Sequence, residues 1–193
     1  MNKFTKAQSV IIAGVGGQGA VTVAQLILGA AWKSKLHVLQ SEVHGMSQRG
    51  GAVNAQVLFD TEPVTSPIVM EGAADYLVAM EPLEALRYLP LLSKEAVMVV
   101  STVPLKNMAN YPEISSVLKE LESFKGITLV DTDRYAKELN YRNAGNMVLL
   151  GALSKSLPFS YEIWKETIAE RFKDKGDKII EQNFQAFDVG RKL

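Results

Sequence analysis

Cysteine is absent from the 193-residue chain. Without it, the chain can form no disulfide, offer no thiolate nucleophile and hold no iron–sulfur cluster through cysteine ligands. Histidine is scarce as well, because His37 and His44 are the two copies, and two histidines are too few for a histidine-rich metal site. We therefore predict that this chain by itself binds no metal and no cofactor.

An excess of charge of either sign is also missing. Lys and Arg total 21, Asp and Glu total 21, and the formal net charge is zero. Nucleic acids and anionic membranes attract proteins through a basic excess, so neither is predicted as a partner.

Long apolar runs are missing too. The longest apolar helical stretch, Gly19 to Trp32, is shorter than the ~20 residues that span a bilayer. The first residues, MNKFTKAQSVIIAGVG, lead through a short apolar segment into a glycine loop and lack the pattern of a signal peptide. We expect a cytoplasmic protein.

What the sequence does contain is an alternation of strand and helix signals. Strands are predicted at 9–13, 36–41, 53–59, 75–80, 96–101 and 127–130. Helices are predicted at 20–34, 82–92, 114–124, 133–140, 143–156, 160–172 and 177–188, with Ser160 and Asp177 as N-caps. The pattern indicates a single α/β domain over 1–193, with a mixed, mostly parallel sheet flanked by helices, a Rossmann-like first βαβ unit and a helical C-terminal tail.

A glycine loop, GVGGQG, joins the first strand to the first helix. Gly14, Gly16 and Gly19 satisfy the G-x-G-x-x-G pattern of a dinucleotide-binding turn. Its glycines allow close backbone approach, and the helix N-terminus that follows attracts phosphate. Glu42 falls near the place of the ribose-binding acid. The alternative is a tight strand–helix turn that packs against a partner.

The connection between the second and third strands weighs against a dinucleotide. It spans only about ten residues, Val43 to Ala52, and contains Gly45, Gly50 and Gly51. A parallel crossover needs a dozen or more residues, usually with a helix. The third strand is therefore predicted to run antiparallel to the second, which makes the sheet mixed.

That connection carries a cluster of polar side chains, in the stretch SEVHGMSQRGGAVNAQ. Arg49 is suited to bidentate pairing with a carboxylate or phosphate. His44 and Gln48 are possible hydrogen-bond donors, and Gly50 and Gly51 allow backbone amides to face an anion. The other interpretation is a loop whose polar groups cap neighbouring elements, and for His44 alone this is the favoured one.

Three further polar residues have two interpretations each. Glu81 and Asp131 follow strands, where α/β sites gather, or they cap the next helix. Asn146 faces a partner or ligand, or it is a buried structural asparagine.

Four motifs in order, GVGGQG, SEVHGMSQRGGAVNAQV, AMEPLEALR and NMVLLGALSK, resemble the γ-type subunits of 2-oxoacid:ferredoxin oxidoreductases. The resemblance covers nearly the whole chain, and the wording of the second motif looks like the indolepyruvate branch of the family. The candidate ligand-binding or interface residues are Gly14, Gly16, Gly17, Gln18, Gly19, Glu42, His44, Gln48, Arg49, Gly50, Gly51 and Asn146.

The resemblance implies an enzyme that decarboxylates a 2-oxoacid on thiamine diphosphate with Mg, sends electrons through iron–sulfur clusters to ferredoxin and passes the acyl group to coenzyme A. In the indolepyruvate branch, a separate larger subunit holds the thiamine diphosphate and the clusters. The present chain has no cysteine and no G-D-G followed by Asn, the metal–diphosphate motif of thiamine enzymes. It is therefore expected to be an accessory subunit that is inactive without its larger partner.

Two other functions remain open from the sequence. One is a free-standing dinucleotide-binding oxidoreductase that uses GVGGQG. The other is a non-catalytic interaction protein whose glycine loop binds no ligand.

Overall fold

The computed structural model describes residues 4, 6–45 and 50–193. Within these ranges, six strands form one sheet in the order β2-β3-β1-β4-β5-β6. Their bounds are β1 (Gln8–Val15), β2 (His37–His44), β3 (Ala52–Asp60), β4 (Ala74–Ala79), β5 (Leu92–Ser101) and β6 (Ile127–Val130). All six lie where the sequence predicted strands, although β2 extends three residues further and includes Glu42 and His44. β5 begins four residues before the predicted start at 96, and the helix predicted over 82–92 ends at Arg87.

The sheet is mixed, as predicted. β1, β4, β5 and β6 run parallel, whereas β3 is antiparallel to both β1 and β2. The two strands of the first βαβ unit are therefore parallel to each other, but β3 lies between them. In a nucleotide-binding fold the second strand takes that place beside the first.

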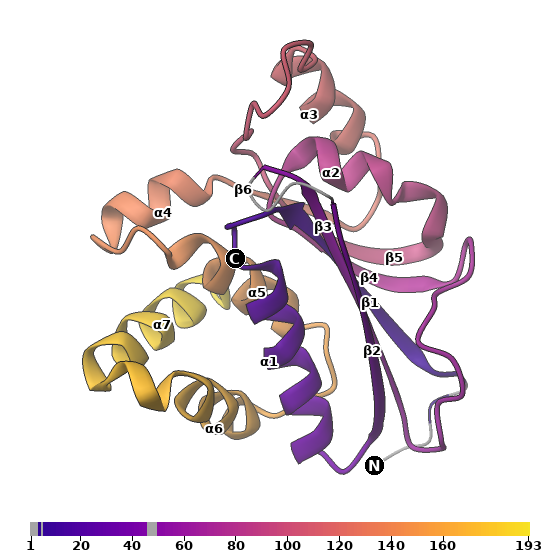
Figure 1. Cartoon of the computed structure of the whole chain (residues 1–193), viewed down its shortest axis with the longest axis vertical. Coiled ribbons are helices and arrows are strands. Elements are labelled where there is room, and N and C mark those ends of the chain that lie inside the picture. Colours follow the sequence, from indigo (N-terminus) through magenta and orange to yellow (C-terminus); the bar gives the residue numbers. More distant parts are fainter. Residues whose placement is uncertain (1–3, 5, 46–49) are drawn as a thin grey trace.

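Helices cover both faces of the sheet (Figure 1). One face is covered by α1 (Ala20–Lys33), α4 (Thr132–Glu138), α5 (Ala144–Ser154), α6 (Tyr161–Phe172) and α7 (Asp177–Gly190), and the other by α2 (Pro82–Arg87) and α3 (Ile114–Glu122). In the described part of the chain, no helix has the length and apolarity that a membrane span needs.

The central strand β1 shows why the sequence folds in layers. Val10 and Ile12 pack into the core under α1 and α5, and Ile11 and Ala13 into the core under α2 and α3. Successive side chains of a strand point to opposite faces, and both faces are buried here. This explains why β1 reads as a continuous apolar run.

The tail forms the four helices that the sequence predicted. Ser160 caps α6, because its hydroxyl accepts a hydrogen bond from the Ile163 N–H at 3.3 Å. The prediction that Asp177 caps α7 is wrong. Gly176 is the N-cap, with φ 84°, and Asp177 is the first helical residue. Its carboxylate still lies in the first turn, where the helix dipole favours an anion.

Two glycines decide how α5 and α7 cross. A Cβ on Gly151 would collide with the carbonyl oxygen of Phe187, and a Cβ on Gly190 with that of Val148. The two helices therefore pack backbone against backbone. No sequence motif indicated this contact.

Candidate functional site

The carboxyl ends of the parallel strands meet at one edge of the sheet. There, β1 continues into the glycine turn and β4 into Met80. The helix after β1 lies on one face of the sheet and the helix after β4 on the other. Neighbouring parallel strands whose helices diverge in this way mark the crevice where α/β proteins bind ligands.

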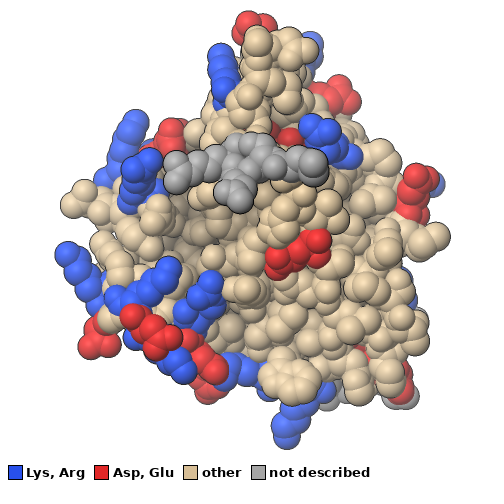
Figure 2. All heavy atoms as spheres, viewed as in Figure 1, with Lys and Arg blue, Asp and Glu red and all other residues tan. Residues whose placement is uncertain are grey.

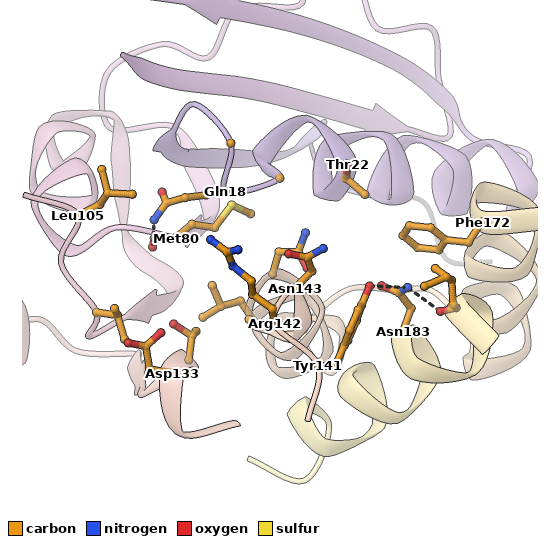
Figure 3. Close-up of a pocket in the computed structure, with 18 of the residues that line it drawn as sticks. Gln18, Thr22, Met80, Leu105, Asp133, Tyr141, Arg142, Asn143, Phe172 and Asn183 are labelled. Carbon is orange, nitrogen blue, oxygen red and sulfur yellow. Dashed lines mark hydrogen bonds between the residues drawn. The ribbon is translucent and has the colours of Figure 1, made fainter. Parts of the chain in front are cut away.

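A cavity of about 750 Å³ opens at this crevice. The glycine turn forms one wall and the segment 103–105 after β5 another, and the chain from Tyr141 to Asn146 leads into α5 between them. Phe172 and Asn183 lie at the far end, on the side of α6 and α7 (Figure 3), and Ile179 adds to the lining. The cavity therefore has polar side chains both near the strand ends, where Gln18 and Arg142 lie, and beneath the tail.

Gln18 fixes the shape of the glycine turn. Its Oε1 accepts a hydrogen bond from the Val15 N–H at 2.8 Å, and its Nε2 donates to the Met80 carbonyl at 3.1 Å. A Cβ on Gly14 would lie 3.1 Å from that Oε1 and 3.2 Å from the Met80 Cβ. Gly14 therefore allows β1 and the end of β4 to approach each other. Both the oxygen and the nitrogen of the Gln18 amide bond backbone groups of the protein itself.

Asn146 contacts the start of α1. Gly19, with φ 88°, leaves the space that the Asn146 amide occupies, since a Cβ there would collide with Nδ2. Asn146 lines the cavity, and its Oδ1 is buried without a hydrogen-bond partner among the described residues. An unsatisfied buried acceptor costs about 1–3 kcal/mol. A ligand N–H or O–H would remove that cost.

The end of the cavity near the strands favours an anion. Both α1 and α5 begin there. Gly19, the N-cap of α1, has no side chain, and the side chain of Asn143, the N-cap of α5, does not bond the first turn of its helix. Helix N-termini attract negative charge. Arg142 lines the same end and forms no ion pair with another described residue. Figure 3 shows its guanidinium pointing into the cavity toward Gln18 and Met80.

The surrounding surface carries charges of both signs. Lys and Arg side chains lie among Asp and Glu side chains over α4, α6 and α7, whereas the surface over β2 and β3 carries few charges (Figure 2). Lys175 adds a second cation to the cavity lining, and Asp133 is the acidic residue there. Within the described ranges, no group of three His, Cys, Asp or Glu side chains could hold a metal ion.

The polar stretch between β2 and β3 lies beside the glycine turn. The Gly51 carbonyl accepts a hydrogen bond from the Gly16 N–H at 2.9 Å, and the Gly50 carbonyl accepts one from the Asn107 side chain. The groups that form these contacts are the carbonyls of Gly50 and Gly51, whereas the sequence had indicated their backbone amides as groups that face an anion. Gln48 and Arg49 lie outside the described residues.

Glu42 and His44 lie on the same face of the edge strand β2. The His44 Nε2 is 3.1 Å from Glu42 Oε2, and the Gln40 side chain donates to Oε1 of the same carboxylate. Because β3 separates β2 from β1, Glu42 is about 9–10 Å from β1 in the direction across the sheet. It therefore does not take the position of a ribose-binding acid.

A second, smaller hollow of about 470 Å³ lies between His44 and the glycine turn. It shares the backbone of Gly17 and Gly19 with the larger cavity. The sequence placed His44 and the glycine loop in separate motifs, and the structure brings them together.

Glu81 and Asp131 are helix caps. Asp131 accepts a hydrogen bond from the Arg134 N–H at 3.0 Å. Glu81 is 1% exposed and accepts from the Glu84 N–H at 2.8 Å, the Leu105 N–H at 3.3 Å and the Tyr111 hydroxyl. Burial, and next the Glu81 carboxylate, raise the pKa of Tyr111. Glu81 thereby holds the loop after β5 at the edge of the cavity.

Arg142 was not among the residues singled out from the sequence. It stands in a charged and polar segment, ELNYRNAGN, that has no recognised motif before Asn146. Its position just before the N-terminus of an apolar helix was the available signal, because an exposed arginine there adds to the positive end of the helix dipole.

Comparison with known proteins places the whole fold in one family. The family described as pyruvate ferredoxin/flavodoxin oxidoreductase matches residues 9–193. The indolepyruvate oxidoreductase subunit IorB of Archaeoglobus fulgidus is 35% identical over 94% of this chain and 92% of its own. The protein of the same name from Pyrococcus horikoshii is 37% identical over 97% of this chain and 96% of its own.

A solved structure shows the same fold. The 2-oxoglutarate:ferredoxin oxidoreductase from Magnetococcus marinus, solved with 2-oxoglutarate, coenzyme A and succinyl-CoA bound, superposes with a TM-score of 0.77 at 23% identity. The match covers 98% of this chain and 31% of that one.

Proposed function

The chain belongs to the pyruvate ferredoxin/flavodoxin oxidoreductase family, as a small subunit of a 2-oxoacid oxidoreductase, and we propose that its enzyme acts on indolepyruvate or a related aryl pyruvate. The names of the relatives at 35% and 37% identity support this substrate. The proposed reaction is oxidative decarboxylation to an acyl-CoA, with electrons passed to ferredoxin.

The redox cofactors belong to a larger partner subunit in this proposal. The chain has no cysteine to bind an iron–sulfur cluster and no diphosphate–metal motif for thiamine diphosphate. Its own residues do not fit either group. What the chain contributes is a binding surface, and Arg49 together with Gly50 and Gly51 remains a candidate for contact with the partner or substrate.

Coenzyme A is the compound of this reaction that suits the large cavity. Its phosphates are anions, and Arg142 and the starts of α1 and α5 provide positive charge at the end near the strands. Its amide and amino groups are donors of the kind that the buried Asn146 Oδ1 lacks. The observation that carries the proposal is the meeting of two helix N-termini, an arginine without an ion pair among the described residues, and an unsatisfied acceptor.

Reconstitution tests the proposal. The purified chain and its larger partner are assayed separately and mixed, with indolepyruvate, coenzyme A and an electron acceptor. We expect turnover only from the mixture, and a colourless chain when it is alone. Turnover by the chain alone would refute the subunit role, and a mixture that consumes no coenzyme A would refute the acyl-CoA product.

Dinucleotide binding is tested in the same preparation. The position of β3 between β1 and β2 removes the ribose-binding acid from the glycine turn. We therefore expect no NAD or NADP binding by calorimetry. Micromolar binding of either would favour a free-standing oxidoreductase.

A further inference from the structure

The smaller hollow contains a histidine held by a carboxylate. His44 ends β2, its side chain is 54% exposed, and its Nε2 lies 3.1 Å from Oε2 of Glu42. The Gln40 side chain bonds the other oxygen and so fixes the carboxylate. A carboxylate on one ring nitrogen favours the tautomer that is protonated there, which leaves the other nitrogen, Nδ1, as a base.

The surroundings of His44 suit proton transfer. Apart from His44, the hollow is lined by glycine backbone and by small or branched apolar residues, among them Val15, Val21 and Val53. Glu42 is the charged side chain in hydrogen-bond contact with His44, and on β3 its register partner is Val53. The first turn of α1 contributes no acidic side chain.

The glycine turn joins this hollow to the larger cavity. Gly17 and Gly19 line both, and a Cβ added to Gly17 would meet nothing within 4 Å. The turn therefore presents bare backbone between Arg142 on one side and His44 on the other. A long molecule anchored by phosphates at Arg142 can cross this turn and bring its other end to His44.

We propose that His44, oriented by Glu42, is the general base that accepts the thiol proton of coenzyme A. The proposal rests on the function proposed above, in which the acyl group is transferred to coenzyme A. In this step the S–H bond breaks, the proton moves to Nδ1, and the electron pair stays on sulfur as the thiolate that accepts the acyl group. This proton transfer changes no oxidation state, and the two electrons lost by the oxoacid when the acyl group forms go to ferredoxin in the function proposed above.

The test uses the reconstituted complex with His44→Gln, and His37→Gln as the matched control. His37 is the other histidine and starts the same strand that His44 ends. General-base catalysis is worth 10²–10⁴-fold, so at pH 7 we expect kcat/KM for coenzyme A to fall by about that factor in His44→Gln only. In the His37→Gln control, decarboxylation measured without coenzyme A should not change.

The pH profile separates a base from a structural role. Free thiols ionise with a pKa of about 8.5, so the His44→Gln rate should rise roughly 15-fold between pH 7 and pH 8.5 and narrow its gap to the wild-type rate by about that factor. Glu42→Gln should show a smaller loss with the same trend. A His44→Gln profile parallel to that of the wild type, or a rate equal to it, overturns the proposal.

The two proposals fail differently. If the wild-type complex consumes indolepyruvate without forming an acyl-CoA, both the acyl-transfer function and the role of His44 are refuted. If the wild type forms acyl-CoA and His44→Gln does so equally at pH 7, only the role of His44 is refuted.

Discussion

Glycines in two regions of this chain have different roles. Gly17 and Gly19 in the turn after β1 have positive φ; a Cβ on Gly17 would meet nothing, and a Cβ on Gly19 would collide with the Asn146 side chain. Gly151 and Gly190 lie in helices, and a Cβ on either would collide with a backbone carbonyl. Gly17 leaves the backbone of the turn open, whereas the helical pair removes all space between two helices. Glycine is therefore found both at the open edge of the sheet and at the backbone contact between α5 and α7.

The same two regions differ in how their polar groups are satisfied. Under the tail, Asn183 is 2% exposed and its Nδ2 donates to the Tyr141 hydroxyl and the Ile179 carbonyl. At the open edge, the buried Oδ1 of Asn146 has no partner among the described residues. Buried polar groups in folded proteins are normally paired. The unpaired Oδ1 of Asn146, near an Arg142 that has no ion pair among the described residues, therefore supports the proposed ligand site.

The largest effect is expected where the helices touch. Gly151→Ala forces α5 away from the Phe187 carbonyl of α7 and should cost about 3 kcal/mol of unfolding free energy. For a chain of this size that lowers Tm by roughly 6–12 °C. The control is Gly29→Ala in α1, where the new Cβ meets only the Thr167 Cγ2 methyl. A Tm loss as large in the control would show that the backbone contact is not the cause.

The next effect concerns the turn at the open edge. Gln18→Ala removes the partners of the Val15 N–H and the Met80 carbonyl. Leaving buried backbone groups unpaired should cost about 2 kcal/mol, measured by chemical denaturation. Gln185→Ala is the surface control, because its amide bonds only the exposed Glu181, and we expect a change within about 0.5 kcal/mol. An equal loss of unfolding free energy in Gln18→Ala and Gln185→Ala would contradict the role of Gln18 in stabilising the glycine turn.

A smaller effect compares two glycines in open space. Gly17 has φ 101° and Gly72 has φ 69°, and a Cβ on either would meet nothing within 4 Å. Alanine at either position should cost about 1–2 kcal/mol for left-handed backbone. Only Gly17→Ala should also weaken coenzyme A binding by the complex, because Gly17 lines both hollows. Unchanged affinity in Gly17→Ala would contradict a ligand path across the turn.

The smallest effect is a pH dependence away from the site. Burial raises the pKa of Glu84, an effect that Arg87 opposes. The folded state then holds the proton of Glu84 more tightly than the unfolded chain does. The resulting stabilisation of the folded state is present below about pH 4.3, the pKa of an unperturbed glutamate. It is lost as the pH rises through the raised pKa of Glu84 in the folded state. Between pH 4 and 7, the unfolding free energy of Glu84→Gln should therefore improve relative to wild type. A difference in unfolding free energy between Glu84→Gln and wild type that stays constant from pH 4 to 7 would contradict a raised pKa of Glu84.

Much of the fold was predictable because its signals are local. The strands, the tail helices and the antiparallel third strand follow from apolar patterns and from the short connection between residues 43 and 52. The crossing of α5 and α7 was not, because Gly151 and Gly190 are far apart in the sequence. Asp177 failed as a cap because Gly176 already makes the turn into α7.

The candidate site was predictable only in part. The glycine turn, His44 and Asn146 carry motif signals, and the structure shows that they line two hollows with shared walls. Arg142 has no motif around it, and the role proposed for it depends on α5 starting at the same crevice as α1. That convergence is a property of the three-dimensional fold.

The most direct test of a ligand site at the open edge is calorimetric titration of coenzyme A into the reconstituted complex carrying wild-type chain or Arg142→Ala. Losing a charge-assisted hydrogen bond costs on the order of 1.5–3 kcal/mol, so we predict a 10- to 100-fold weaker Kd. Arg142→Lys should recover only part of it. Assembly and Tm should stay unchanged, because Arg142 is exposed. Equal affinity in wild type and Arg142→Ala would contradict the account.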